Sequence, residues 1–123
     1  MDAIKPNELQ QLTDVRNALL HLHKALLDGQ RARYEREHGA ISSPSAFLQL
    51  AISDPAFDWL HRFSELVVEI DESTDGDEPL TSDAGSALLE QARQLLSGKP
   101  LGDAVSGNIQ LRQQVDDLMK KLG

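Results

Sequence analysis

The sequence predicts an all-α protein, on three observations. Apolar residues recur at helical spacing over most of the chain, as in amphipathic helices that turn one face toward a core. Serine, threonine, asparagine or aspartate precedes the apolar segments, in places followed by proline, which is the usual start of a helix. No segment alternates apolar and polar residues with β-branched enrichment, as a half-buried strand would. We therefore expect helices joined by short connections, and no sheet.

The first and longest helix is expected over residues 7–38. Asn7 is a suitable N-terminal cap, and Gly39 is a residue at which helices commonly stop. At a rise of about 1.5 Å per residue, this helix would be roughly 48 Å long. Its apolar residues are spaced by three and four, which keeps one stripe facing a partner. They are Leu12, Val15, Leu19, Leu22 and Leu26.

The second arm is expected over residues 44–53 and 55–71, with a break between the two parts. Ser43-Pro44 and Asp54-Pro55 each combine a capping residue with a proline at the first helical position. Because proline lacks an N–H group, Pro55 indicates either a new helix or a kink in one long helix. The part after the break is apolar on most faces, which is typical of a central helix. Its apolar residues are Ala56, Phe57, Trp59, Leu60, Phe63, Leu66, Val67, Val68 and Ile70.

Two shorter helices are expected over residues 82–97 and 104–122. Thr81 or Ser82 would cap the first of them. Gly107 leaves the start of the last helix open within a few residues, because glycine favours turns over helix interiors. The apolar seam of the last helix consists of Leu111, Val115, Leu118 and Leu122.

Four helical arms with short connections pack most simply as an up-and-down antiparallel four-helix bundle. We expect a single domain over residues 1–123, which is long enough to bury a sizeable core. The first two arms are longer than the last two, so part of the apolar surface of the long pair would stay uncovered. A second copy of the chain could cover that surface.

Composition and charge narrow the function classes. Apolar residues make up 40% of the chain and charged residues 26%, as in an ordinary globular domain. The formal charge of −8 argues against nucleic acid as a partner, because phosphate binding needs a cationic surface. No apolar run approaches the roughly 20 residues that cross a bilayer, and the N-terminus lacks a signal-peptide pattern. Together with the absence of cysteine, this predicts a cytoplasmic protein with no membrane partner.

The charges are unevenly distributed along the chain. Residues 69–78 hold six acidic residues and no basic one, whereas arginines gather in the second half of the first helix. Tyrosine and arginine are favoured contact residues in protein interfaces. The candidate contact surface, for a second copy or another protein, is therefore Arg31, Arg33, Tyr34 and Arg36.

Two carboxylate-x-x-histidine pairs suggest an alternative, a di-metal site. In di-iron bundles this spacing places both ligands on one helix face, and two such helices enclose the metals. The second pair is Asp58 with His61, and Glu65 follows one turn later; the first ends at His38. Against a closed site, His38 is expected at the end of its helix and Asp58 is short for a bridging ligand. Surface residues that pair through charge are the favoured interpretation.

The acidic segment after the second arm resembles the start of a calcium-binding loop. With Asp71 in the first position, Asp75, Gly76 and Asp77 occupy the fifth, sixth and seventh positions, as oxygen ligands and the sharp turn require. The twelfth position is Ser82, where a bidentate glutamate is needed. The pattern therefore favours a solvated acidic connection over a cation site.

Among the standard short motifs, the nucleophile elbow, the phosphate loop and the dinucleotide fingerprint are missing from the sequence. The leading hypothesis is a non-enzymatic protein that acts through self-association or protein–protein contact, with no cofactor. The alternative is a metal-binding bundle. A third hypothesis is a small-ligand pocket where the break at Asp54-Pro55 leaves a gap beside Trp59.

One stretch of the chain resembles a known family. It contains Tyr34-Glu35-Arg36-Glu37, Ser43-Pro44, Phe47-Leu48-Gln49-Leu50, Asp54-Pro55-Ala56-Phe57-Asp58-Trp59-Leu60 and Ile70-Asp71-Glu72. These segments look like those of a family of small, uncharacterised bacterial helical proteins, and the likeness covers residues 34–72. The resemblance implies a helical fold and a bacterial source. It implies no activity and no catalytic residue.

Overall fold

The computed structural model describes residues 2–123 and confirms the all-α class. Within that range the sole β-type pairing is an isolated bridge between Ala3 and Thr81. Six α-helices and one short 3₁₀ turn follow one another, where the sequence indicates five helical segments. They are α1 (Pro6–His38), α2 (Pro44–Ser53), η1 (Pro55–Phe57), α3 (Asp58–Asp75), α4 (Ser82–Leu96), α5 (Lys99–Val105) and α6 (Ile109–Leu122).

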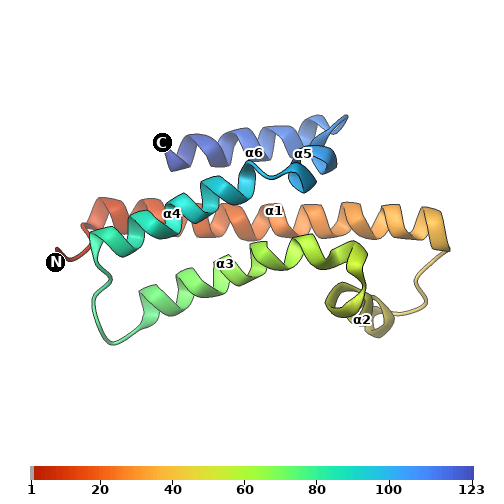
Figure 1. The fold of residues 1–123 in the computed structure, drawn as a ribbon, viewed down its shortest axis with the longest axis horizontal. Helices are drawn as coiled ribbons and strands as arrows, with labels where there is room; N and C mark the ends of the chain where they lie inside the picture. The colour runs from red at the N-terminus through yellow and green to blue at the C-terminus, as the bar shows by residue number, and fades with distance from the viewer. Residues whose placement is uncertain (1) are drawn as a thin grey trace.

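The long helix α1 is the axis of the fold (Figure 1). Helix α3 runs beside it in the opposite direction, α4 returns in the direction of α1, and α6 runs back again. Helix α1 packs against all three, and α4 also packs against α3 and α6. The C-terminal turns of α1 extend beyond α4 and α6, as the difference in arm length predicts (Figure 1). Helix α2 lies near that end and packs against η1 and α3.

The break in the second arm separates two helices. Ser43 and Asp54 both act as caps, because their side chains accept hydrogen bonds from the backbone N–H groups of Ala46 and Ala56. Pro55 opens the turn η1, whose backbone leads directly into α3. The sequence left a kink and a new helix as alternatives, and the structure has the new helix.

Three boundaries differ from the prediction. Helix α1 begins at Pro6 and its cap is Lys5, whose N–H donates to the Glu8 side chain, so the expectation that Asn7 is the cap is wrong. The last helix begins at Ile109 instead of residue 104, because residues 104 and 105 belong to α5 and Gly107 turns the chain between the two helices.

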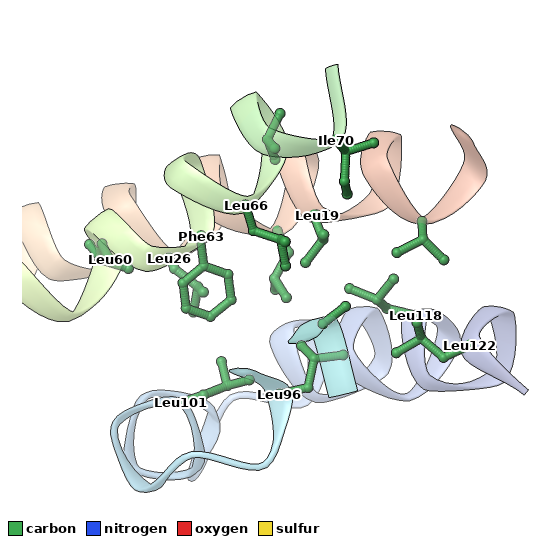
Figure 2. Close-up of a cluster of buried hydrophobic side chains, with 14 of the residues drawn as sticks. Leu19, Leu26, Leu60, Phe63, Leu66, Ile70, Leu96, Leu101, Leu118 and Leu122 are labelled. Atoms are coloured by element: carbon green, nitrogen blue, oxygen red, sulfur yellow. The ribbon is translucent and has the colours of Figure 1, made fainter. Parts of the chain in front are cut away.

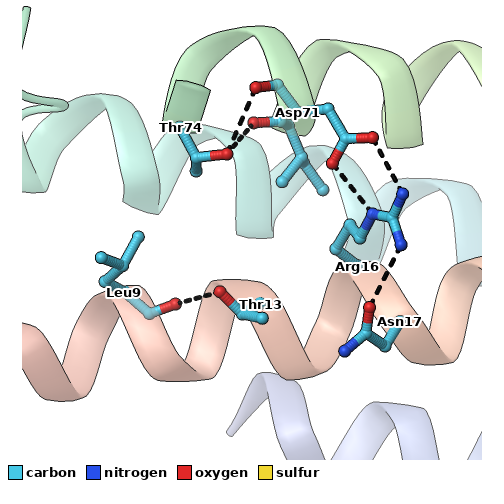
Figure 3. A network of polar contacts seen from close by, with 7 residues as sticks. Leu9, Thr13, Arg16, Asn17, Asp71 and Thr74 are labelled. Atoms are coloured by element: carbon cyan, nitrogen blue, oxygen red, sulfur yellow. Dashed lines mark hydrogen bonds and ion pairs between the residues drawn. The ribbon is translucent and has the colours of Figure 1, made fainter. Parts of the chain in front are cut away.

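Helix α3 continues to Asp75, whereas the sequence places its end near residue 71. Directly before the extra turn, the guanidinium of Arg16 bonds to both carboxylate oxygens of Asp71 at 2.9 Å (Figure 3). The Thr74 hydroxyl also donates to the carbonyl of Ile70, one turn earlier. This long-range ion pair has no signal in the local pattern.

Helix α5 is not predicted by the sequence, which indicates a connection over residues 99–103. Pro100 stands in its first turn, where proline is tolerated, and Leu101 is buried. With seven residues the helix is too short to show an apolar period. Gly107, with a φ of 78°, turns the chain into α6, which is capped by the Asn108 side chain.

The core is one continuous apolar cluster to which α1, η1, α3, α4, α5 and α6 contribute. The stripe predicted for the first helix is buried as expected. Figure 2 shows side chains from α1, α3 and α6 pointing toward one another, with Leu96 and Leu101 closing the cluster. Within residues 2–123 no polar or charged residue is buried, so the core is held by apolar burial alone.

The N-terminal segment is fixed to the start of α4. The N–H of Ile4 donates to the carbonyl of Leu80 at 2.8 Å, and the N–H of Ser82 donates to the carbonyl of Asp2 at 3.0 Å. Gly85 in α4 lies against the Ile4 side chain. Across the described chain, 2–123, none of the helices combines the length and apolarity needed to span a membrane.

Candidate functional site

Helix α2 is the only helix of residues 2–123 that has no buried residue, although most of its side chains are apolar. Phe47, Leu50 and Ala51 lie partly buried against the core. On the opposite side, Leu48 is 60% exposed and Ile52, one turn later, is 64% exposed. The helix contains no charged residue. We call Leu48 and Ile52 the outer face of α2.

Helix α2 is held in place by contacts on its inner side. The guanidinium of Arg31 lies 4.6 Å from the centre of the Phe47 ring, in a cation–π contact. Phe47 meets Phe57 of η1 edge to face at 6.0 Å. From α3, His61 donates its Nε2–H to the carbonyl oxygen of Ala51 at 2.7 Å. These contacts come from three different elements, so the outer face of α2 has a defined position.

The predicted contact surface on α1 divides into two pairs. Arg31 makes the cation–π contact with Phe47 and forms an ion pair with Glu35 at 3.4 Å. Tyr34 packs against the core, with its ring stacked on His38 at 4.4 Å. Both are therefore used within the chain. Arg33 and Arg36 instead line a polar groove beside the turn between α5 and α6.

The structure does not bring the four proposed di-metal ligands together. His38, at the end of α1, donates from Nδ1 to the Tyr34 carbonyl at 3.3 Å. His61 is used in the bond to α2, and Glu65 lies 3.5 Å from Arg62 in an ion pair. Asp58 is exposed at the first turn of α3. Throughout residues 2–123, no three histidine or carboxylate side chains form a group that could hold a metal ion.

The acidic segment does not have the conformation of a calcium loop. Asp71 and Asp75 belong to the last turn of α3, and Asp77 is in the connection beyond Gly76. The carboxylate of Asp71 already binds Arg16 through two hydrogen bonds (Figure 3), which lower the pKa of Asp71 below its usual value. The expectation of a loop from residue 71 onward is therefore wrong, because α3 includes these residues.

A pocket does lie beside Trp59, but the break at Asp54-Pro55 is not part of it. The pocket has a volume of about 130 Å³ and is mostly apolar. Its far wall comes from the junction of α4 and α5. The sequence does not indicate that this junction lies beside Trp59. The residues that line it are Trp59, Phe63, Gln94, Leu95, Gly98, Pro100 and Leu101.

A histidine on α1 is also affected by its surroundings. Partial burial of His23 lowers the pKa of its imidazole, and the positive charge of nearby His61 lowers the same pKa further. His61 is the residue of α3 that bonds to α2, so His23 on α1 lies near the residue that makes this connection. The sequence alone does not show this proximity, because His23 and His61 belong to different helices.

No family model, curated protein or solved structure matches this chain.

Proposed function

We propose that this chain is a four-arm helical bundle that acts without catalysis, by contact with a second copy of itself or with another protein. The outer face of α2 carries this proposal. Burying a large aliphatic side chain stabilises a protein by about 1.5–3 kcal/mol relative to leaving it exposed. Leu48 and Ile52 forgo most of that stabilisation in the single chain, since each is more than half exposed.

The position of this face supports a contact role. Leu48 and Ile52 stand side by side, because residues four apart lie on the same side of a helix. Without charges of its own, α2 presents a surface that loses little favourable hydration when a partner covers it. The contacts from Arg31, Phe57 and His61 fix the helix in advance, which lowers the entropy lost on binding.

The setting that we propose is the cytoplasm, and the absence of cysteine supports it. The formal charge of −8 favours a protein partner over nucleic acid.

A double substitution, Leu48→Glu with Ile52→Glu, tests the contact directly. The control is Ile109→Glu on α6, because Ile109 is also a largely exposed aliphatic residue, at 77%. Tagged wild-type and variant chains are used as bait for an untagged copy and for proteins of the native cell. Sedimentation velocity measures the mass of each purified chain across a wide concentration range.

We expect the wild type and the Ile109→Glu control to associate, with a second copy or with one defined protein. The double variant should lose that association while its circular dichroism spectrum stays helical. A wild-type chain that is monomeric at every concentration and retains no protein would contradict the proposal. Equal retention by the wild type and the double variant would contradict it as well.

A further inference from the structure

The polar groove at the turn between α5 and α6 has features of a ligand site. Its volume of about 520 Å³ is in the range of small-molecule sites, which is about 300–1,000 Å³. One wall is a single face of α1, formed by Gly29, Ala32, Arg33 and Arg36 at helical spacing. Gly29 and Ala32 project little beyond the backbone, so they leave open space beside the longer side chains of Arg33 and Arg36.

The opposite wall is built by the end of α5 and the turn that follows it. Asp103, Ser106, Gly107 and Asn108 line this wall. Gly107 has a φ of 78°, a conformation that other residues rarely adopt, so this turn depends on glycine. Helix α6 starts directly after Asn108, and the positive end of its dipole adds to the potential of the groove.

The distribution of unpaired arginines points to the kind of ligand. The chain has seven arginines, and four of them lie within 4.0 Å of a carboxylate partner. In the described chain, the three without such a partner are Arg33, Arg36 and Arg112, and all three lie around the same turn. Arg33 and Arg36 line the groove, and Arg112 borders an adjoining hollow that shares Gly107 and Asn108 with it.

This clustering is unusual in a chain with a formal charge of −8. Excess acidic residues elsewhere make it easy for an arginine to find a carboxylate, yet these three guanidinium groups remain unpaired beside one turn. Placing like charges near one another is unfavourable unless an anion compensates them. The planar guanidinium group binds carboxylate and phosphate oxygens through two parallel hydrogen bonds.

We propose that this groove binds a small molecule that bears at least two oxyanion groups, either phosphate or carboxylate. Arg33 and Arg36 hold one group from the α1 side, and Arg112 attracts the second from the α6 side. Asp103, the one carboxylate in the wall, faces the ligand as a hydrogen-bond acceptor and selects against anions without a donor group. This proposal is independent of the contact at α2.

Two probes of defined chemistry test the site on the full chain. Inorganic pyrophosphate represents ligands with phosphate groups. Citrate represents ligands with carboxylate groups and also has one hydroxyl donor. Each is titrated by isothermal calorimetry at constant ionic strength, so that general screening stays the same throughout. Binding of pyrophosphate alone identifies a phosphate ligand, and binding of citrate alone identifies a carboxylate ligand.

The variant Arg33→Gln/Arg36→Gln should weaken binding of the probe about tenfold or more, because charge-assisted hydrogen bonds are lost. The matched control is Lys24→Gln/Arg62→Gln, which removes the same total charge outside the groove and should keep the affinity. Asp103→Asn should tighten pyrophosphate binding, because it removes the repelling carboxylate. A further check is the thermal midpoint of the wild type, which should rise with the concentration of the bound probe.

Saturable binding that depends on Arg33 and Arg36 and not on the control pair supports the proposal. Failure of both probes to bind the folded wild-type chain would overturn it. An equal loss of affinity in the groove variant and in the control would also overturn it, because the binding would then reflect net charge alone.

Discussion

Two glycines inside helices, Gly29 in α1 and Gly85 in α4, provide a quantitative test of the packing. A Cβ atom added at Gly29 meets no other atom within 4 Å. Alanine is more favourable than glycine in a helix interior by about 0.8–1.0 kcal/mol. Gly29→Ala should therefore stabilise the chain by about 1 kcal/mol, which corresponds to a rise in thermal midpoint of roughly 4 °C for a domain of this size.

The same substitution at Gly85 should give a different result. Its Cβ would lie 2.9 Å from the Cδ1 atom of Ile4, closer than such atoms approach. The Ile4 backbone is bonded to Leu80 at 2.8 Å, so the end of its side chain must turn aside instead. Displacing this methyl group, which belongs to a partly buried residue, costs up to about 0.8 kcal/mol. This cost offsets part of the gain in helix propensity, so Gly85→Ala should stabilise the chain less than Gly29→Ala does.

The pair Gly85→Ala and Ile4→Val completes the test as a double-mutant cycle. Because Ile4→Val removes the Cδ1 atom, it relieves the clash, and the double variant should be more stable than the sum of the single effects. Chemical unfolding followed by circular dichroism measures all four free energies. If Gly85→Ala stabilises the chain as much as Gly29→Ala does, or if the cycle shows no coupling, the placement of Ile4 against α4 is incorrect.

Three further predictions concern the core and the titrating groups. Leu19→Ala should destabilise the chain by about 2–5 kcal/mol in chemical unfolding, because Leu19 has no exposed surface and the substitution leaves a cavity; a smaller loss would contradict its central position. His23 has a lowered pKa, so the stability linked to it is present above the ordinary histidine value of 6.5 and is lost as the pH falls through the lower value of the folded chain. Between pH 7 and 5, the free energy of unfolding should therefore fall less steeply with pH for His23→Leu than for the wild type. Parallel profiles for the two chains would refute this. Asp71→Asn should reduce stability at neutral pH and have no effect once the pH is below the lowered pKa of Asp71, since the bond to Arg16 is then lost in both chains; an equal loss at every pH would refute the ion-pair explanation.

The helical class and the core stripe of α1 could be predicted from the sequence because they depend on local spacing. Leu12, Leu19 and Leu26 repeat every seven residues, and this spacing alone places them on one face. The caps Ser43 and Asp54 were likewise recognised from neighbouring residues, and both act as predicted.

Features that depend on distant residues were not predictable. Near the end of α3, Asp71 is bonded by Arg16, which lies 55 residues earlier in the chain. Helix α5 depends on burial of Leu101 against other helices, and a seven-residue segment has no period to reveal it. In both places tertiary contact decides the local structure.

In the candidate sites too, local features can be predicted from the sequence and contacts between distant residues cannot. The arginine cluster on α1 is visible in the sequence, but the sequence does not show that Arg31 contacts Phe47 or that Tyr34 packs against the core. Nor does it show that Arg112, far along the chain, joins Arg33 at one turn. The outer face of α2 is indicated in the sequence by one feature. Residues 44–53 contain more apolar side chains than a single buried face requires.

Site-specific photo-crosslinking in the native cell is the decisive test of the proposed contact at α2. A benzophenone amino acid replaces Leu48 in one chain and, as the control, Ile109 in another; both positions are largely exposed. We expect a discrete product of higher mass from position 48, either twice the mass of the chain or its mass plus that of one partner, and no such product from position 109. The absence of any crosslinked product at position 48, or the same products from both positions, would contradict the proposed contact.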